Sequence, residues 1–174
     1  INDVNKSISS GWKNIDDEIW LIGSTSSEVT LGASSYLEYY HDQITGRPPK
    51  TDLLDEKLSQ TFIRDAISED LIASSHDVSD GGLVTALAEC CIFSSKGAQI
   101  DLHLSERIDK SLFGEGGSRI IFSIKKENKN KWLNYLSEKD KNLTDTVYIQ
   151  KIGKVSTSQL QVKYIDKILL NVKV

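Results

Sequence analysis

The segment His76-Asp77-Val78-Ser79-Asp80-Gly81-Gly82-Leu83 separates a short run of small and apolar residues from a long apolar one. Residues 72–75 precede it and predict a short strand. Residues 83–93, with the sequence LVTALAECCIF, are apolar on nearly every side, and their glycine start and alanine content favour a buried helix over a strand. The segment therefore predicts a connection from a strand to a helix.

The side chains of this connection are typical of a site for a magnesium-bound nucleotide. Gly81 and Gly82 at a helix entrance let the backbone approach a ligand closely, and the free N–H groups there favour a phosphate. Asp77 and Asp80 offer the hard oxygen ligands that suit Mg²⁺, and Ser79 adds a hydroxyl at the same corner. The residues alone thus predict part of a magnesium-nucleotide site, with Ser79, Gly81 and Gly82 as candidate nucleotide contacts and both Asp77 and Asp80 open as metal ligands.

A purely structural interpretation of the same residues is also open. Asp80 or Ser79 can serve as the N-cap of the following helix, because both types accept hydrogen bonds from a helix's first N–H groups. The two glycines can allow close packing of helix on strand, and His76 can be a structural histidine with satisfied partners. Clusters of Asp, Ser and Gly before helices are common, so the loop alone does not define a reaction.

Apolar periodicity predicts further elements on both sides of this segment. The strongest is a helix that begins after Thr51 or Asp52 and continues to Leu71 with apolar residues at three- and four-residue spacing. Gly46-Arg47-Pro48-Pro49 breaks the chain before it, because proline fixes φ and disfavours helix in the preceding residue. Other helices are predicted over residues 31–41 and 127–136, and strands over 18–23, 100–104, 119–124, 147–155, 161–165 and 168–172.

The irregular alternation of strands and helices predicts a mixed α/β or α+β class rather than a doubly wound parallel sheet. A chain of 174 residues fits one domain, residues 1–174, with a core of its own. Its 39% hydrophobic and 26% charged residues are typical of a soluble globular protein. Because the chain begins at Ile1 and contains no Met, we expect it to be a piece of a longer protein.

Charge and cysteine content argue against several function classes. The net charge of -4 argues against nucleic-acid binding, which usually needs a basic patch. Cys90 and Cys91 are adjacent and too few for a disulfide framework or a zinc site, so we expect reduced thiols in the core of a cytoplasmic protein. No segment has the length of a transmembrane helix, so no membrane partner is expected.

Residues 76–89, HDVSDGGLVTALAE, resemble a signature of the synthetase subunit of phosphoribosylformylglycinamidine synthase, also called formylglycinamide ribonucleotide amidotransferase. Four other segments match motifs of that family in the same order. They are LGASSYL at 31–37, GRPP at 46–49 followed by Asp52, Leu53 and Glu56, LFGE at 112–115 followed by Arg119, and IGKV at 152–155. The resemblance thus covers nearly the whole chain.

The resemblance implies a C-terminal-type domain of the aminoimidazole ribonucleotide synthetase-like superfamily, with α/β/α layers and a mixed sheet. It implies that the parent is an ATP-dependent C–N ligase of purine biosynthesis. That enzyme converts formylglycinamide ribonucleotide and glutamine-derived ammonia to formylglycinamidine ribonucleotide. ATP and Mg²⁺ are the implied cofactors. The implied partners are the N-terminal domains of the same synthetase and, in the small form of the enzyme, a glutaminase subunit and a small helper subunit.

By residue match, the resemblance implies that Asp77 contacts Mg²⁺ and Ser79 contacts a nucleotide at a second, supporting site. The family's catalytic residues lie in earlier domains. We therefore assign no catalytic residue to this chain and expect the isolated domain to be inactive.

Two alternatives remain open at the level of sequence. One is the C-terminal domain of another superfamily member, of the selenophosphate synthetase or thiamine monophosphate kinase type. The other is a non-catalytic interaction module. Outside the loop, Arg119 is expected to pair with a nearby carboxylate, and Tyr36, Tyr39 and Tyr40 are expected in the core or at a domain interface.

Overall fold

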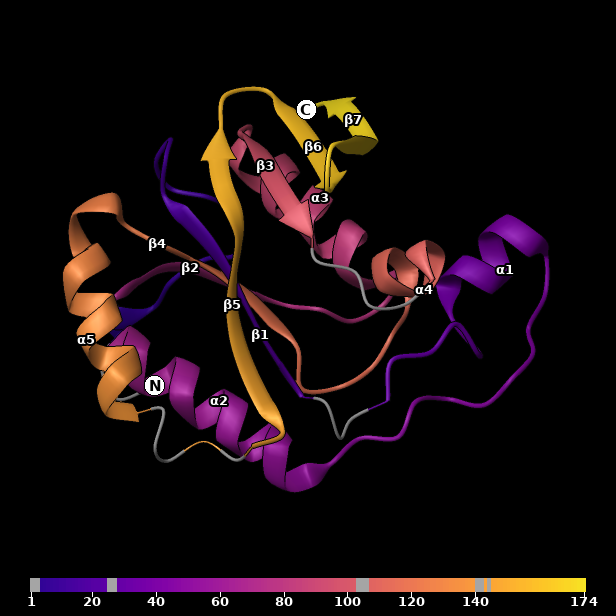
Figure 1. The fold of residues 1–174 in the computed structure, drawn as a ribbon, viewed down its shortest axis with the longest axis horizontal. Helices are drawn as coiled ribbons and strands as arrows, with labels where there is room; N and C mark the ends of the chain where they lie inside the picture. The colour runs from indigo at the N-terminus through magenta and orange to yellow at the C-terminus, as the bar shows by residue number, and fades with distance from the viewer. Residues whose placement is uncertain (1–3, 25–27, 103–106, 140–142, 144) are drawn as a thin grey trace.

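The computed structural model describes residues 4–24, 28–102, 107–139, 143 and 145–174. Along these residues strands and helices follow one another in an irregular order (Figure 1). The strands are β1 (Glu18–Ser24), β2 (Ile72–Asp77), β3 (Gly97–Leu102), β4 (Ile120–Ile124), β5 (Val147–Ser156), β6 (Gln159–Tyr164) and β7 (Lys167–Lys173). The helices are α1 (Ser35–His41), α2 (Leu53–Ser68), α3 (Gly82–Ser94), α4 (Ile108–Phe113) and α5 (Lys129–Lys139), with short 3-10 turns η1 (Val4–Lys6) and η2 (Lys126–Asn128).

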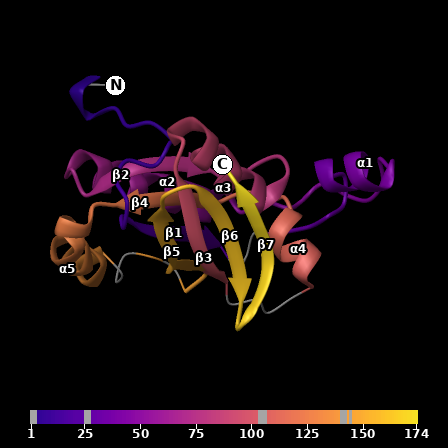
Figure 2. The same ribbon diagram turned by 90° about the horizontal axis from the view of Figure 1, so that it is seen from above.

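These strands form one mixed sheet in the order β2-β4-β1-β5-β3-β6-β7. Neighbouring strands are antiparallel, except that β3 and β6 run parallel. Strand β1 lies between β4 and β5, and every one of its residues is buried. Figures 1 and 2 both show helix α1 at one end of the molecule, away from the sheet. The predicted mixed class is confirmed.

Side chains of β1 divide between two hydrophobic cores. Ile19 and Leu21 pack with residues of α3, whereas Trp20 and Ile22 pack with residues of α2 and α5. Because successive side chains of a strand point to opposite faces, the two cores lie on opposite faces of the sheet. The domain therefore has the predicted α/β/α layers.

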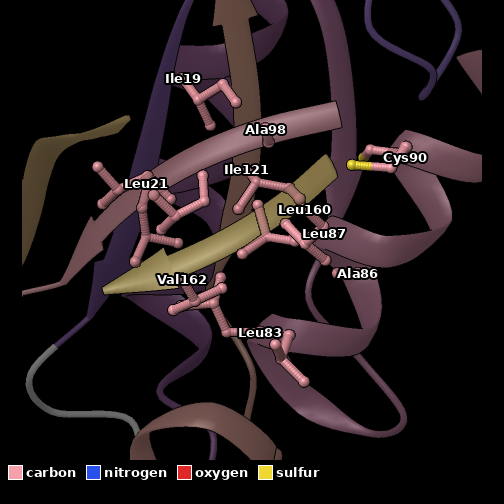
Figure 3. Packing of buried hydrophobic residues seen from close by; sticks show 14 of the residues in the cluster. Ile19, Leu21, Leu83, Ala86, Leu87, Cys90, Ala98, Ile121, Leu160 and Val162 are labelled. Atoms are coloured by element: carbon pink, nitrogen blue, oxygen red, sulfur yellow. The ribbon is translucent and has the colours of Figure 1, made fainter. Parts of the chain in front are cut away.

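Helix α3 supplies much of the first core. Figure 3 shows Leu83, Leu87 and Cys90 of this helix facing the strands, where Ile121 and Val162 lie. Leu87, Cys90 and Ile121 are fully buried. The apolar character of residues 83–93 therefore has the predicted physical cause, which is burial of the helix against the sheet.

The second core is built around the fully buried ring of Trp132 in α5. The rings of Trp20, Phe62 and Phe122 meet it edge-on, with centroids 5.5, 5.9 and 5.3 Å away. Edge-to-face contacts of this kind favour one ring arrangement over others. They fix α5 and α2 on the same face of the sheet.

Helix α2 confirms the strongest of the predicted helices. Its N-cap is Asp52, whose side chain accepts hydrogen bonds from the N–H groups of Leu54 and Asp55. The predicted helix over residues 31–41 is shorter in the structure, because Ala33 has a φ of 55° and Ser34 is the N-cap of α1. Helix α2 also ends earlier than predicted, at Ser68 and not at Leu71, with Glu69 as its C-cap. Both corrections follow from hydrogen bonds at the cap residues, which periodicity does not report.

Three other expectations differ from the structure. Helix α4 was not predicted, because six residues are too few to show a helical period. The helix predicted over 127–136 is divided between η2 and α5. The strand predicted over 100–104 is β3, which begins at Gly97 and ends at Leu102; residues 103 and 104 lie outside the described residues.

The buried face of α3 provides a test of the fold in the 174-residue chain. Leu87→Ala removes a fully buried side chain, and we expect it to lower the free energy of unfolding by about 2–5 kcal/mol. Ile92→Ala on the same helix is the control, because Ile92 is 65% exposed and such changes cost about 0.5 kcal/mol or less. Urea unfolding followed by circular dichroism measures both, and equal losses would contradict the described packing.

Candidate functional site

The loop between β2 and α3 is anchored by one apolar residue and exposes its polar ones. Val78 is buried, and its N–H donates to the carbonyl oxygen of Arg119 at 2.9 Å. Asp77, Ser79 and Asp80 on either side of it are exposed. The loop thus continues the pairing of β2 with β4 while its carboxylates and hydroxyl face outward.

Helix α3 begins without a side-chain cap. Its N-cap is Gly81, with a φ of 76°, and this residue has no side chain of its own to accept a hydrogen bond from the first N–H groups of the helix. The interpretation of Asp80 or Ser79 as N-cap is therefore wrong. The reason is the left-handed backbone of Gly81, which a residue with a side chain rarely adopts and which makes the glycine itself the cap.

Gly82 allows a close backbone contact, although the contact is with the end of α4 and not, as the structural interpretation had it, with a strand. A Cβ at this position would lie 2.6 Å from the carbonyl carbon of Phe113 and 2.8 Å from the carbonyl oxygen of Gly114. Only glycine therefore allows the start of α3 to approach the end of α4 this closely.

A pocket of about 580 Å³ opens beside this loop. It brings together segments that are far apart in the sequence: the proline pair 48–49, the loop residues 77–80 and the turn and strand residues 115–120. Ala33 and, from α2, Glu56 and Gln60 complete its lining. Four of the five motif segments thus meet at one place, since only the late IGKV segment contributes no lining residue.

The turn after α4 holds these segments together. The Oε1 atom of Glu115 accepts hydrogen bonds from the backbone N–H groups of Ser35 and Gly81, each at 2.8 Å. The backbone of Glu115 also exchanges two hydrogen bonds of 2.9 Å with Thr30. The N–H and hydroxyl of Ser118 donate to Oε2 of Glu56 at 2.6 and 2.9 Å, which attaches the same turn to α2.

Arg119 is buried below this turn and does not form the expected ion pair. Its Nη2 donates to the carbonyl oxygen of Gly114 at 2.6 Å, and no carboxylate of the described residues lies at ion-pair distance. Its Nε is buried without a hydrogen-bond partner among those residues. Burial lowers the pKa of the guanidinium, and the proximity of Tyr148 and Glu115 partly offsets this effect. Arg119 therefore stabilises the turn through a main-chain oxygen.

The residues predicted for nucleotide contact are divided by the structure. Ser79 lines the pocket together with Asp77. The N–H of Gly81 donates to Glu115, and that of Gly82 donates to the carbonyl oxygen of Ser79 at 3.1 Å. These two amides already have acceptors, so a nucleotide could use them only by displacing a protein group. Sequence reasoning missed the roles of Glu115 and Glu56, whose contacts join residues far apart in the chain.

These features agree with the comparison to protein families. The model of the family described as AIR synthase related protein, C-terminal domain, matches residues 14–163. The chain belongs to this family. The resemblance found in the motifs is thereby confirmed for the C-terminal-type domain as a whole.

Relatives in this family carry the name that the motifs indicated. The chain is 57% identical over 175 residues to the phosphoribosylformylglycinamidine synthase subunit PurL of Prochlorococcus marinus strain MIT 9301, covering 100% of this chain and 22% of that protein. It is 42% identical over 153 residues to PurL of strain MIT 9313, covering 83% and 19%. The chain thus spans about a fifth of the length of the curated relatives it matches.

Solved structures share the fold. PurL of Thermotoga maritima complexed with FGAR superposes with a TM-score of 0.75 at 15% identity, covering 98% of this chain and 29% of that one. The hydrogenase maturation protein HypE of E. coli gives a TM-score of 0.60 at 10% identity, covering 97% and 51%. At these identities the likeness shows the fold alone.

A second pocket of this AIR synthase-type domain, about 510 Å³ in volume, is lined by aromatic rings. Tyr36 stacks on Tyr40 and on Phe113, with ring centroids 5.4 and 4.8 Å apart. Tyr39 and Tyr40 are 85% and 74% exposed, so of the two expected positions, the core or a domain interface, the core is wrong for both. We call Tyr36, Tyr39, Tyr40 and Phe113 the aromatic ledge.

His76 has the satisfied environment of a structural histidine. Its Nδ1 lies 3.3 Å from Oδ1 of Asp77, and its Nε2 lies 3.2 Å from Oε2 of Glu89. Its ring stacks on Phe93 with centroids 6.3 Å apart.

Among the described residues, no group of three or more His, Cys, Asp or Glu side chains is arranged to hold a metal ion. No helix of the described part is long and apolar enough to cross a membrane.

The two cysteines lie in the core, as predicted. Both are fully buried, and Nε1 of Trp12 donates to Sγ of Cys91 at 3.3 Å. Burial raises the pKa of both thiols, which suppresses the thiolate form that reacts.

This environment predicts slow thiol chemistry in the native chain. We expect iodoacetamide at pH 8 to leave Cys90 and Cys91 unmodified in buffer and to alkylate both in 8 M urea, because unfolding exposes the thiols and removes the pKa shift. Intact-mass spectrometry over one hour measures the number of adducts. Rapid modification of the folded chain would contradict the buried position.

Proposed function

We propose that this chain is the C-terminal domain of an ATP-dependent ligase of purine biosynthesis that makes formylglycinamidine ribonucleotide from formylglycinamide ribonucleotide and glutamine-derived ammonia. The names of its relatives support the reaction class. Thermotoga PurL structures complexed with ATP, ADP and FGAR support nucleotide and substrate classes for the parent. The observation that carries the proposal is the meeting of four motif segments in one pocket.

In this reaction the amide oxygen of the substrate attacks the terminal phosphorus of ATP, and ADP leaves. The phosphorylated oxygen is then a good leaving group, so ammonia adds to the same carbon and inorganic phosphate departs. The residues for these steps belong to the earlier domains of the parent. We assign a supporting role to this chain and no catalytic residue.

The pocket residues fit a nucleotide that arrives with a divalent cation. Asp77, Asp80, Glu56 and Glu115 line it, whereas Arg119 is the only basic residue among its lining residues. A phosphate alone would be repelled by these carboxylates, so a cation must accompany it. Mg²⁺ commonly uses one or two protein carboxylates and completes its shell with water and phosphate oxygens.

Within this pocket we assign Asp77 to the metal and Ser79 to the nucleotide. Both side chains are exposed at the pocket, and the side chain of Asp77 is 72% exposed, which leaves its carboxylate accessible to a hydrated ion. Mg²⁺ would neutralise phosphate charge there. Gly81 and Gly82 contribute to this site by shaping the backbone, because their N–H groups are already bonded.

The aromatic ledge supports a second role, as a surface against the N-terminal domains of the same synthetase. Large exposed apolar patches are characteristic of interaction sites, and α1 places the ledge at the end of the molecule (Figure 1). About four-fifths of the length of the curated relatives lies outside the matched region, which provides such a partner. A glutaminase subunit and a helper subunit are proposed partners of the assembled cytoplasmic enzyme, in line with a solved PurLQS assembly from Thermotoga maritima.

The second candidate is the C-terminal domain of another superfamily enzyme. The shared fold with HypE supports this candidate. The higher TM-scores with PurL and the names of the relatives favour the amidotransferase. Turnover of formylglycinamide ribonucleotide by the parent protein discriminates between the two.

Asp77→Asn tests the metal assignment in the parent synthetase. The change keeps the shape of the side chain and removes its charge, so we expect the supporting Mg-ADP site to weaken by about tenfold or more. Asp70→Asn is the control, because Asp70 is exposed and lies at the opposite end of β2. Isothermal titration of Mg-ADP gives site number and affinity, with the other nucleotide site of the parent as internal reference. Unchanged affinity in Asp77→Asn would remove Asp77 from the metal role.

Because we place the catalytic residues in the other domains of the parent, we predict that the 174-residue chain makes no product by itself. We expect no formylglycinamidine ribonucleotide when it is incubated with formylglycinamide ribonucleotide, ATP, Mg²⁺ and ammonia, because the catalytic groups lie elsewhere. A coupled assay for ADP and mass detection of the product measure this. Sustained product formation would show that the catalytic residues lie in this chain after all.

A further inference from the structure

Glu115 provides an acceptor that the start of α3 lacks. In many helices a Glu at the third position reaches back to the N–H of the N-cap residue. Here the third residue of α3 is Val84, whose side chain cannot accept a hydrogen bond, and the N-cap is Gly81. Oε1 of Glu115, from a turn distant in the sequence, accepts that N–H at 2.8 Å instead.

The same oxygen atom also accepts the N–H of Ser35 at 2.8 Å. One carboxylate therefore ties the first residue of α1 to the N-cap of α3. Ser35 and Gly81 both line the pocket of the aromatic ledge, whereas Glu115 itself lines the pocket beside the loop 77–80. Glu115 thus stands between the two pockets.

The position of Glu115 is set from its main chain as well. Its backbone exchanges two hydrogen bonds with Thr30, and the preceding carbonyl, of Gly114, accepts from the buried guanidinium of Arg119. At the next residue, a Cβ on Gly116 would lie 2.4 Å from the carbonyl oxygen of Glu28, so the turn passes in close contact with that segment. A carboxylate held this firmly can orient the loop it bonds.

Its charge also affects where an anion can bind. The first turn of a helix favours negative charge, and α3 already has the carboxylate of Glu115 at this end. A phosphate at the same place would be repelled by it, whereas the exposed side chains of Asp77 and Ser79 can reach a phosphate through a metal or a hydroxyl.

We infer that Glu115 is a positioning residue for the nucleotide site, because it caps α3, orients the loop 77–80 toward the pocket and directs phosphate away from the helix start. This inference rests on the proposed nucleotide role of that loop. It assigns to the LFGE segment a function in binding that acts through Gly81 and not through contact with the nucleotide.

Three substitutions in the parent synthetase test it by titration of Mg-ADP. Glu115→Gln keeps an oxygen acceptor for both N–H groups, so we expect affinity at the supporting site within about threefold of the unmodified enzyme. Glu115→Ala removes the acceptor, and we expect a loss of about tenfold or more. Glu115→Asp withdraws the carboxylate by one methylene and should give an intermediate loss. Glu138→Ala, an exposed carboxylate on α5, is the control.

Chemical rescue separates positioning from a general loss of structure. Sodium formate provides a free carboxylate that fits the space left in Glu115→Ala. We therefore expect 50 mM formate to raise the affinity of this variant for Mg-ADP by about threefold or more. Sodium chloride at the same ionic strength should not. A general loss of structure would lower Tm and respond to neither salt. If the alanine variant does not fold, the aspartate variant carries the test with the same measurement.

The outcomes separate this inference from the proposed function. Wild-type affinity in Glu115→Ala and Glu115→Asp, together with weakened binding in Asp77→Asn, would overturn the positioning role and leave the site assignment intact. Unchanged binding in Asp77→Asn would overturn the site assignment itself. A loss in Glu115→Ala that neither glutamine nor formate restores would also overturn the positioning role.

Discussion

The close contact of Gly82 with the backbone of Phe113 and Gly114 is the constraint on which the assembled pocket depends. Any side chain at position 82 would overlap that backbone, since even a Cβ would lie 2.6 Å from its nearest atom. The approach brings the turn after α4 to the start of α3, and it places Glu115 within hydrogen-bond distance of Gly81. From there the same carboxylate reaches Ser35. The absence of a side chain at Gly82 thus allows the hydrogen bonds of Glu115 to join three segments of the chain.

Sheet topology explains why these segments are neighbours at all. Strands β2 and β4 are antiparallel, so the carboxyl end of β2 lies beside the amino end of β4, with Asp77 opposite Ile120. The loop that leaves β2 and the turn that enters β4 therefore emerge at the same end of the sheet. The hydrogen bond from Val78 to Arg119 extends the pairing by one step into the loop. Because β2 is the outer strand of the sheet, the loop residues beyond Val78 remain open to solvent and to a ligand.

The sequence predicts those features whose information is local. Residues 83–93 predict α3 because burial requires an apolar surface, and Asp52 predicts the start of α2 because capping is a short-range hydrogen bond. The pocket contacts were not predictable in the same way. Gly81 and Gly82 offer free N–H groups when the loop is considered alone, whereas the folded chain provides Glu115 and the carbonyl oxygen of Ser79 as acceptors. The order of motifs indicates that these segments matter together, but only the fold shows which atoms meet.

Under the proposed function, the charges of the pocket make this domain one wall of a larger site. Four carboxylate residues line it, and its one basic residue, Arg119, is directed to the carbonyl oxygen of Gly114. On that proposal, the charge of nucleotide phosphates would be compensated by a bound cation and by basic groups of the parent's other domains. On the same proposal, the exposed aromatic ledge beside the pocket would contact those domains and fix their position relative to it. Under the proposed function, the fold therefore orients carboxylates with its own internal bonds, and it relies on the assembled enzyme for the positive charge that makes them a nucleotide site.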